Sequence, residues 1–266
     1  VPEFDDSSWR KLNLPHDWGI EGPFKQEYPG ETGKLPWWGV AWYRKHFTLS
    51  ESDAGKRIGL AMDGAMSYAS VWLNGKLVGG WPYGYASWQL DLTPFVKVGS
   101  ENVLAIRLDN PKDSSRWYPG GGIYRNVWLT KTAPVHIGQW GVRVTTPEVS
   151  KKSATVRVQV TADNSSDAKA AITVKTLIYA SKNGKQSDLV ATLDTGVVPI
   201  DSNSSEANTE QAIILNPKLW DIKTPNLYFA VTTLEQAGKI IDHLETPFGI
   251  RTIEFTATNG FLLNGQ

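Results

Sequence analysis

Apolar and polar residues alternate with a period of two in a series of short stretches, and this pattern limits the fold more than any other feature of the chain. The stretches are 42–49, 57–62, 68–73, 102–108, 154–160, 171–179 and 227–234. A period of two sends successive side chains to opposite faces of an extended strand. No window of about 12 or more residues has convincing helical spacing. The sequence therefore predicts an all-β protein.

Turn signals separate the alternating stretches. Asn-Gly pairs occur at 74–75, 183–184, 259–260 and 264–265. Both residue types tolerate the positive φ angles of a type I′ hairpin turn. The chain also contains 24 glycines and 15 prolines, which interrupt it too often for long helices. We therefore expect antiparallel sheets built from hairpins.

The charge balance narrows the possible partners. Lysines and arginines number 27, and aspartates and glutamates also number 27. No basic field is present to attract nucleic acid or an anionic membrane surface, so we expect neither as a partner. The chain has no cysteine, which excludes disulfides and thiolate zinc sites but leaves the compartment open.

No stretch of the sequence has the length and apolar character of a membrane span or the pattern of a targeting segment. The numbering begins at Val1 rather than at a methionine. We expect that an amino-terminal piece, such as a signal peptide, has been removed. A periplasmic or secreted location is on this ground favoured over a cytoplasmic one.

The composition changes near residue 133, which predicts a domain boundary. Residues 1–133 hold most of the 12 tryptophans, whereas the segment after Pro134 alternates more plainly and is rich in Thr, Val, Ser and Lys. Residues 134–248 have the length and the short strands of an immunoglobulin-like sandwich, without the cysteine pair of antibody domains. Residues 249–266 form a third, short segment.

Residues 116–125 read Arg-Trp-Tyr-Pro-Gly-Gly-Gly-Ile-Tyr-Arg and form the most informative loop. Three successive glycines permit positive φ angles and close backbone approach, at a cost in conformational entropy. Trp117 and Tyr118 offer flat faces with polar edges, and Arg116 offers a planar fork of donors. The loop therefore suits a neutral polar ligand. The alternative is a glycine-rich corner whose aromatic side chains are buried in the core.

A second aromatic loop covers residues 28–38. Its Trp37 and Trp38 could wall a pocket from the other side, or could fill the gap under a long loop. We assign Trp42, Trp72 and Trp128 to the core because they lie on expected strands.

Several motifs, in order, resemble the amino-terminal region of glycoside hydrolase family 2, the family of β-galactosidases, β-glucuronidases and β-mannosidases. They are Leu-Pro-His-Asp-Trp at 14–18, Trp-Tyr-Arg-Lys at 42–45, Val-Trp-Leu-Asn-Gly at 71–75, Asp-Leu-Thr at 91–93, the 116–125 loop, Pro-Phe-Gly-Ile-Arg at 247–251 and Gly-Phe-Leu-Leu-Asn-Gly at 260–265. The likeness covers essentially the whole chain.

The resemblance implies a jelly-roll, galactose-binding-like sandwich over 1–133, an immunoglobulin-like sandwich over 134–248 and, at 249–266, the lead-in to a (β/α)₈ barrel that carries two catalytic glutamates. The family's acid/base glutamate follows an asparagine, and no Asn-Glu pair occurs in these 266 residues. We therefore expect a non-catalytic amino-terminal portion of a retaining β-glycosidase, β-galactosidase-like, that is inactive alone. Its barrel would be its partner, and the parent enzyme could be a homo-oligomer.

The resemblance also implies that the 116–122 loop lies near the active-site mouth. Arg116 is then the expected sugar contact, with Trp117, Tyr118, Asp113, Trp37 and Trp38 as further substrate-binding candidates. Some relatives place an acidic residue at the position of Arg116, so the sugar stays open between galactoside, glucuronide and mannoside. An autonomous carbohydrate-binding module and a purely structural assembly piece are the other functions considered.

Other candidate chemistry is weaker. Asp63, Asp91 and Asp109 lie at strand ends or beside turns, where aspartate caps backbone groups, so we expect no catalytic pair. The 4 histidines are scattered, and no dense run of oxygen ligands marks a cation site, so we expect neither metal nor cofactor. A calcium ion held by aspartate and backbone oxygens is the alternative that stays open. His16 is expected to tie its loop to the sandwich through hydrogen bonds.

Overall fold

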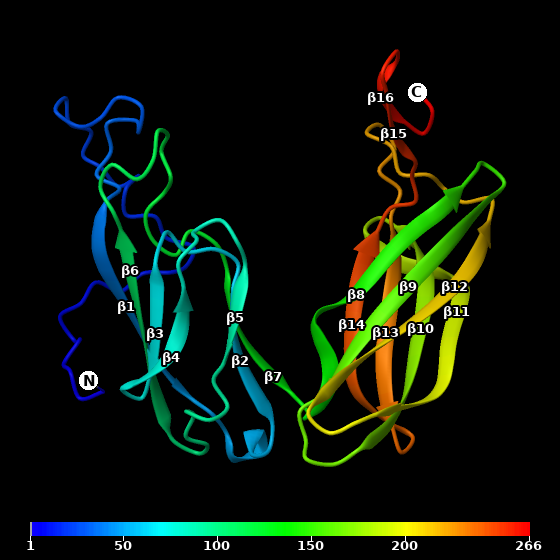
Figure 1. Ribbon diagram of the computed structural model, residues 1–266, viewed down its shortest axis with the longest axis horizontal. Helices are drawn as coiled ribbons and strands as arrows, with labels where there is room; N and C mark the ends of the chain where they lie inside the picture. Colours follow the sequence, from blue (N-terminus) through cyan, green and yellow to red (C-terminus); the bar gives the residue numbers. More distant parts are fainter. Residues whose placement is uncertain (1) are drawn as a thin grey trace. The chain divides into compact units, whose positions relative to one another are not determined.

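The computed structural model describes residues 2–266 and shows an all-β protein (Figure 1). Within this range the regular structure consists of strands β1 to β16 and a single 3₁₀ turn, η1 (Glu51–Asp53). The chain forms two compact units, one up to Thr132 and the other from Ala133 onward. No helix among residues 2–266 has the length and hydropathy needed to cross a membrane.

The first unit is a sandwich of two antiparallel sheets with the jelly-roll architecture predicted from the sequence. One sheet has the strand order β1-β6-β3-β4 and the other β5-β2-β7. The strands are β1 (Gly39–Thr48), β2 (Arg57–Met62), β3 (Ala69–Leu73), β4 (Lys76–Trp81), β5 (Trp88–Asp91), β6 (Glu101–Asn110) and β7 (Val127–Thr132).

Alternation builds the core of this unit. In β3 the side chains of Ala69, Val71 and Leu73 are buried, while the intervening Ser70 and Trp72 are only partly so. The buried faces of both sheets meet in one apolar cluster. Each aliphatic side chain buried there contributes about 1.5–3 kcal/mol of transfer free energy, so the cluster holds the sheets together.

Three tryptophans assigned to this core are not in it. Trp42 is 45% exposed and Trp128 is 54% exposed, and Trp72 is only half-buried. The assignment was wrong because these residues occupy outward positions of β1, β3 and β7, whereas neighbours such as Tyr43 and Val71 face the core. The indole rings of Trp42 and Trp72 contact each other on the outer face, with centroids 5.3 Å apart.

The second unit is an immunoglobulin-like sandwich of a four-stranded and a three-stranded antiparallel sheet, with orders β11-β10-β13-β14 and β12-β9-β8. A hairpin, β15-β16, follows. The strands are β8 (Val135–Val149), β9 (Ser153–Asn164), β10 (Ala170–Lys182), β11 (Lys185–Ile200), β12 (Ser204–Leu215), β13 (Tyr228–Gln236), β14 (Lys239–Phe248), β15 (Ile253–Thr256) and β16 (Gly260–Leu263). The inward residues form a separate apolar cluster.

Two of the predicted Asn-Gly turns connect hairpin strands with positive φ at both residues. Asn74 and Gly75 have φ of 52° and 81° between β3 and β4. Asn183 and Gly184 play the same part between β10 and β11. The pair at 264–265 differs from the expectation, because it follows β16 and joins no described strands.

Asp53 is a buried charge in the connection between β1 and β2. Its side chain is 3% exposed and accepts hydrogen bonds from Lys131 Nζ at 2.6 Å and Lys56 Nζ at 2.9 Å. The hydrogen bond from Lys131, followed by that from Lys56, holds the pKa of Asp53 well below its ordinary value of 3.8. Lys131 lies on β7, so this ion pair ties the connection to the second sheet.

Replacing Asp53 by asparagine should lower the free energy of unfolding at pH 7, because two ammonium groups lose their carboxylate partner. A depressed pKa in the folded state stabilises the fold above the ordinary pKa of 3.8 and loses this effect as the pH falls further. The difference between wild type and Asp53→Asn in urea denaturation should therefore shrink below about pH 4. Asp109→Asn, which breaks the exposed Arg107 pair, is the control and should change the free energy by at most about 1 kcal/mol. An Asp53→Asn effect that does not vary with pH would contradict this account.

Candidate functional site

Loops from separate parts of the sequence gather at one end of the first unit (Figure 1). They are the β2–β3 connection (63–68), the β4–β5 connection (82–87), the β6–β7 connection (111–126) and part of the segment that precedes β1. Backbone hydrogen bonds join them: Tyr68 N donates to Pro82 O at 3.1 Å, and Met66 N donates to Gly122 O at 2.9 Å. These contacts join the β2–β3 connection both to the β4–β5 connection and to the 116–125 loop.

The three glycines of this loop are buried, and close packing explains the residue type. A Cβ atom at Gly121 would lie 2.7 Å from Trp18 Cε2, and one at Gly122 would lie 2.6 Å from Tyr43 Oη. Gly120 and Gly122 also have φ of 87° and 123°, which favour glycine. The glycines therefore form the base of the loop, and the ligand-facing groups must come from elsewhere in it.

The backbone of residues 120–123 exchanges hydrogen bonds with other parts of the chain, and we call this network the hub. His16 N donates to Ile123 O and Trp18 N donates to Gly121 O, both at 2.8 Å. The buried Asn110, the last residue of β6, donates from Nδ2 to Gly120 O at 2.8 Å and to Trp37 O at 2.9 Å. Buried carbonyls left without partners would each cost about 1–3 kcal/mol. Asn110 thus joins the 116–125 loop to the loop that precedes β1.

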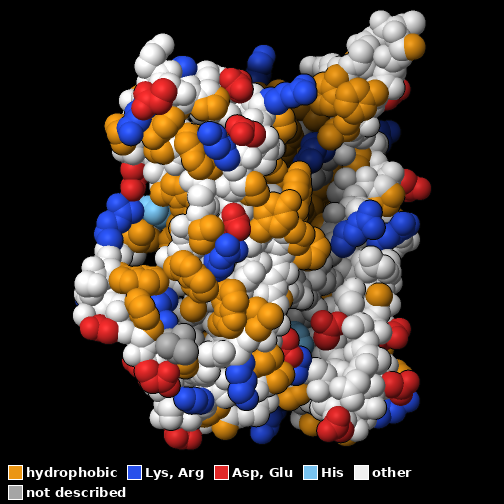
Figure 2. Space-filling model, turned by 60° about the vertical axis from the view of Figure 1, so that its left-hand side comes forward, with side chains coloured by type: hydrophobic (Ala, Val, Ile, Leu, Met, Phe, Trp, Pro, Cys, Tyr) orange, Lys and Arg blue, Asp and Glu red, His pale blue; other side chains and the backbone are white. Residues whose placement is uncertain are grey.

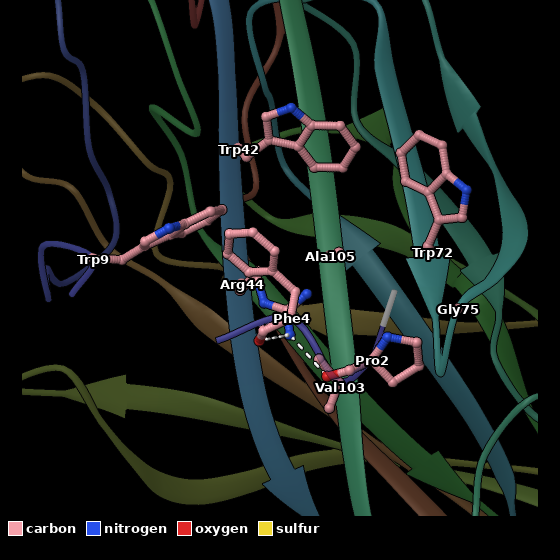
Figure 3. Close-up of a pocket in the computed structure, with 9 residues that line it drawn as sticks. All are labelled: Pro2, Phe4, Trp9, Trp42, Arg44, Trp72, Gly75, Val103 and Ala105. Atoms are coloured by element: carbon pink, nitrogen blue, oxygen red, sulfur yellow. Dashed lines mark hydrogen bonds between the residues drawn. The ribbon is translucent and has the colours of Figure 1, made fainter. Parts of the chain in front are cut away.

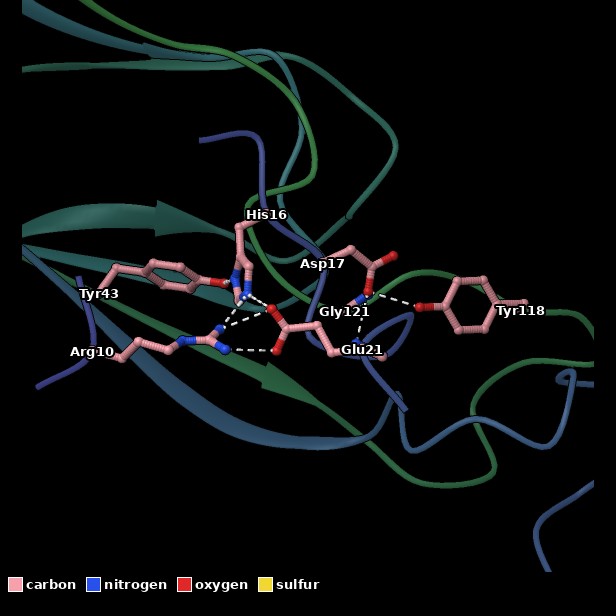
Figure 4. Close-up of polar contacts among 8 residues, drawn as sticks. Arg10, His16, Asp17, Glu21, Tyr43, Tyr118 and Gly121 are labelled. Atoms are coloured by element: carbon pink, nitrogen blue, oxygen red, sulfur yellow. Dashed lines mark hydrogen bonds and ion pairs between the residues drawn. The ribbon is translucent and has the colours of Figure 1, made fainter. Parts of the chain in front are cut away.

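Asp17 is the second anchor of the hub (Figure 4). Its Oδ1 atom accepts hydrogen bonds from Tyr118 Oη at 2.7 Å, from Gly19 N at 2.9 Å and from Gly121 N at 3.0 Å. Burial, followed by the hydrogen bond to Asp17, raises the pKa of Tyr118, so this phenol stays protonated and donating. The Tyr118 hydroxyl is thereby engaged inside the protein.

His16 ties the same segment to β1, as predicted. Its Nδ1 lies 2.7 Å from Tyr43 Oη and its Nε2 lies 2.8 Å from Arg10 Nη2. Nε2 thus faces both the Arg10 guanidinium, which can only donate, and the Glu21 carboxylate, which can only accept. Arg10 pairs with Glu21 at 2.9 Å, and Glu21 Oε1 lies 3.1 Å from His16 Nε2 (Figure 4). Burial raises the pKa of Tyr43 to about 12, so it too keeps its proton.

The exposed groups lie at the tip of the 116–125 loop and just before it. Arg116 and Asp113 are exposed, and Trp117 is 58% exposed. The indole Nε1 of Trp117 donates to Tyr85 Oη at 2.8 Å, which fixes the ring against the β4–β5 connection. Within the described chain, the Arg116 guanidinium has no hydrogen-bonding or ionic partner. Arg116 and Trp117 are therefore presented to solvent on a base that is held in place.

The two tryptophans of the second loop differ sharply. Trp37 is 1% exposed and fills the space under its loop, which is the structural role that the sequence left open. Trp38 is half-buried, packs edge-on against Tyr28 at a centroid distance of 4.9 Å and lies 5.7 Å from Lys112 Nζ. Trp38 thus remains available as a pocket wall and Trp37 does not.

Trp38 lines a cavity of about 370 Å³ beside the hub. Its other lining residues are Arg10, His16, Trp18, Pro36, Gly39, Val40, Ala41 and Tyr43. Of these, sequence reasoning had singled out only Trp38 as a pocket residue and His16 as a structural one. Nothing in the local sequence marks Arg10 or Tyr43, because their contacts with His16 arise only in the folded chain.

A larger cavity of about 470 Å³ lies on the outer face of β1, β6 and β3 (Figure 3). Trp42, Trp72, Phe4 and Trp9 supply most of its aromatic surface. Arg44 crosses it and donates to Asp6 at 2.6 Å, which holds the first residues of the chain on the sheet. Figure 2 shows hydrophobic side chains gathered in groups on the surface of the molecule.

The aspartates considered for catalysis have other partners. Asp91 pairs with Arg57 at 2.6 Å and caps Thr93 N at 2.9 Å, and Asp109 pairs with Arg107 at 2.8 Å. Asp63 accepts from Trp128 Nε1 at 3.2 Å. Residues 2–266 contain no group of three or more His, Cys, Asp or Glu side chains placed to hold a metal ion.

Comparison with known families agrees with this architecture. The model of the glycosyl hydrolase 2 galactose-binding domain-like family matches residues 19–151, and the model of glycosyl hydrolases family 2 matches residues 135–251. The jelly-roll module thus precedes the immunoglobulin-like module along the chain. It belongs to glycosyl hydrolase family 2.

Individual relatives extend the comparison over the whole chain. The chain is 43% identical to the β-galactosidase BoGH2A of Bacteroides ovatus over 100% of its own length, which is 31% of that protein. It is 35% identical to a putative β-glucuronidase of Formosa agariphila over 98% of its length, or 24% of the relative. The chain therefore spans about a quarter to a third of these relatives.

Solved structures give the same result. A glycosyl hydrolase family 2 member from Bacteroides cellulosilyticus superposes with a TM-score of 0.88 at 37% identity, covering 99% of this chain and 35% of the other. The β-glucuronidase of Bacteroides uniformis superposes with a TM-score of 0.85 at 30% identity, covering 99% and 31%.

Replacing Asp17 by alanine should loosen the hub, because Tyr118 Oη, Gly19 N and Gly121 N lose their common acceptor. We expect the free energy of unfolding to fall by about 1–3 kcal/mol in urea denaturation. The pKa of Tyr118, followed by ultraviolet titration, should move down toward its ordinary value of 10.0. Tyr118→Phe leaves the two amides bonded and should cost less. Equal stability of Asp17→Ala and wild type would show that the hub does not depend on this carboxylate.

Proposed function

We propose that the chain is the non-catalytic amino-terminal portion of a retaining β-glycosidase of the β-galactosidase type. The observation that carries the proposal is 43% identity to a β-galactosidase along the full length of the chain, which spans 31% of that enzyme. Two of the carboxylates considered for catalysis, Asp91 and Asp109, are each engaged in an ion pair with an arginine.

Glycoside hydrolysis with retention needs two carboxyl groups about 5 Å apart, one as acid/base and the other as nucleophile. In the proposed enzyme these groups lie on a barrel contributed by residues outside the chain. The chain itself positions the barrel and supplies one wall of the sugar pocket. Arg116 and Trp117 are the groups it offers, with Asp113 from the same connection and Trp38 from the loop that precedes β1. The hydrogen bonds of Asn110 and Asp17 fix the base of the 116–125 loop before the sugar arrives.

This arrangement contributes through preorganisation. Ordering a flexible loop on binding costs conformational free energy that subtracts from affinity. The hydrogen bonds of Asn110 and Asp17 have already fixed the base of the loop in the unbound chain. A sugar that meets Arg116 and Trp117 therefore has chiefly the Arg116 side chain to order, because Trp117 is already bonded to Tyr85.

A β-glucuronidase is the alternative with a specific observation in its favour. The Arg116 guanidinium is exposed and, among the described residues, without a hydrogen-bonding or ionic partner. A guanidinium binds a carboxylate with two parallel hydrogen bonds, and a glucuronide carries a carboxylate where a galactoside carries a hydroxymethyl group. A mannoside would use the same loop through hydroxyl contacts alone.

The enzyme assignment is tested with the gene product extended beyond Gln266 through the expected barrel. We expect turnover of nitrophenyl β-galactoside, whereas turnover of only the glucuronide or the mannoside would move the assignment to that sugar. The 266-residue chain is the matched control and should be inactive on all three. Absence of turnover by the extended protein on every nitrophenyl β-glycoside would remove the glycosidase proposal.

Arg116→Ala in the extended enzyme should raise KM by about tenfold, because a charge-assisted contact to the sugar is lost. Arg125→Ala is the control, since Arg125 is exposed at the other end of the same loop and should leave KM within about twofold. Equal KM values for wild type and Arg116→Ala would exclude Arg116 as a sugar contact.

An autonomous carbohydrate-binding module is separated from this proposal by calorimetry on the chain alone. We expect no measurable heat with methyl β-galactoside or methyl β-glucuronide, because half a pocket buries too little ligand surface to offset the cost of association. Tight binding of either monosaccharide would instead favour the module.

A further inference from the structure

Three exposed aromatic side chains form a strip that runs from the β4–β5 connection to the 116–125 loop. Tyr83 is 59% exposed, Tyr85 is 40% exposed and Trp117 is 58% exposed. The rings of Tyr83 and Tyr85 pack edge-to-face with centroids 5.6 Å apart, and Trp117 Nε1 donates to Tyr85 Oη at 2.8 Å. We call Tyr83, Tyr85 and Trp117 the aromatic strip. It spans the β4–β5 and β6–β7 connections.

The β4–β5 connection is held rigidly under the strip. Tyr124 Oη donates to Gly84 O at 2.8 Å, and Ser87 Oγ donates to Asp63 O at 3.1 Å. A Cβ atom at Gly84 would lie 2.3 Å from Met66 Sδ, so the backbone packs directly on the buried Met66. The backbone at Gly84 is thus held in place by Tyr124 and Met66. The neighbouring rings of Tyr83 and Tyr85 remain exposed.

The chemistry of the strip suits sugar rings better than an apolar protein surface. Aromatic faces stack on the C–H faces of sugars while their polar edges meet hydroxyl groups. Asp113 and Arg116, both exposed, lie in the same connection as Trp117 and add hydrogen-bonding groups of both signs. Aromatic faces flanked by hydrogen-bonding groups match a ligand that has apolar faces and hydroxyl groups around them.

We propose that the aromatic strip is a binding platform for β-linked oligosaccharides, holding sugar units beyond the one contacted by Arg116. This inference rests on the proposed function for the nature of the ligand and extends it from one sugar to a chain of two or more. Tyr83 and Tyr85 are its new residues. The strip favours a chain of sugars over a single sugar, because it offers three aromatic side chains and one sugar ring stacks on only part of that surface.

The test is saturation-transfer NMR on the 266-residue chain, which detects millimolar binding that calorimetry misses. The probes are a β-1,4-linked galactose tetrasaccharide, a β-1,4-linked glucose tetrasaccharide and methyl β-galactoside. We expect transfer to at least one tetrasaccharide and about tenfold less to the monosaccharide, since one ring stacks on only part of the strip. Catalysis plays no part in this readout, so it stands or falls independently of the hydrolysis assay.

Tyr83→Ala and Tyr85→Ala should each reduce the tetrasaccharide signal at least about twofold, because each removes one stacking face. Tyr85→Phe keeps the face but releases Trp117 Nε1, and should have a smaller effect. Phe255→Ala removes an aromatic ring that is 78% exposed on β15 and is the matched control. Circular dichroism and thermal melting establish that each variant is folded.

Absence of transfer to both tetrasaccharides would overturn the platform. So would a signal that survives in the double variant of Tyr83 and Tyr85, or one that falls equally in Phe255→Ala. If transfer occurs as expected but the extended protein hydrolyses no glycoside, the platform stands and the glycosidase proposal falls.

Discussion

The burial of a glycine backbone is the constraint on which the functional end of the first unit depends. Gly121 and Gly122 pack so closely on Trp18, Tyr43 and Trp37 that no Cβ fits. Buried peptide groups must find hydrogen-bond partners, and here these come from segments far away in the sequence. His16, Trp18, Asn110 and Asp17 supply them. The base of the loop is therefore fixed by the hydrogen bonds of its glycine backbone, and the side chain of Tyr118 adds a further bond to Asp17.

The 116–125 loop has a buried part that is anchored by the hub and an exposed part that is open to solvent. Its base is buried and hydrogen-bonded, whereas Arg116 and Trp117 are exposed at its tip. Tyr118 belongs to the base, since its hydroxyl is bonded to Asp17. A rigid base below exposed side chains lowers the cost of binding at the tip, because little of the backbone then needs to be ordered.

Much of the fold could be predicted from the sequence because period-two alternation and Asn-Gly turns are local signals. The stretch 57–62 corresponds to β2, and the turn at Asn74 to the hairpin of β3 and β4. The orientation of strands was harder. Trp42, Trp72 and Trp128 face outward because large apolar residues occupy both faces of these sheets, so the pattern does not say which parity is buried.

The site was predictable only in part, because most of its contacts join residues that are distant in the sequence. The composition of the 116–125 loop marked it as unusual, but Asp17 and Tyr118 lie 101 residues apart and no local pattern links them. Trp37 and Trp38 are neighbours in sequence, yet one is buried and the other half-buried, because the loop has no strand periodicity to assign them. Asn110 gave no signal at all, since an asparagine at a strand end commonly caps a turn.

The division between buried base and exposed tip has an evolutionary consequence. The Arg116 side chain is exposed at the tip, and surface substitutions of this kind usually alter stability by no more than about 0.5 kcal/mol. Substitutions at Gly121 or Gly122 must displace packed neighbours. Mutation can thus explore new tip residues freely while selection preserves the glycines. A scaffold of this kind can diversify its ligand preference without first acquiring spare stability.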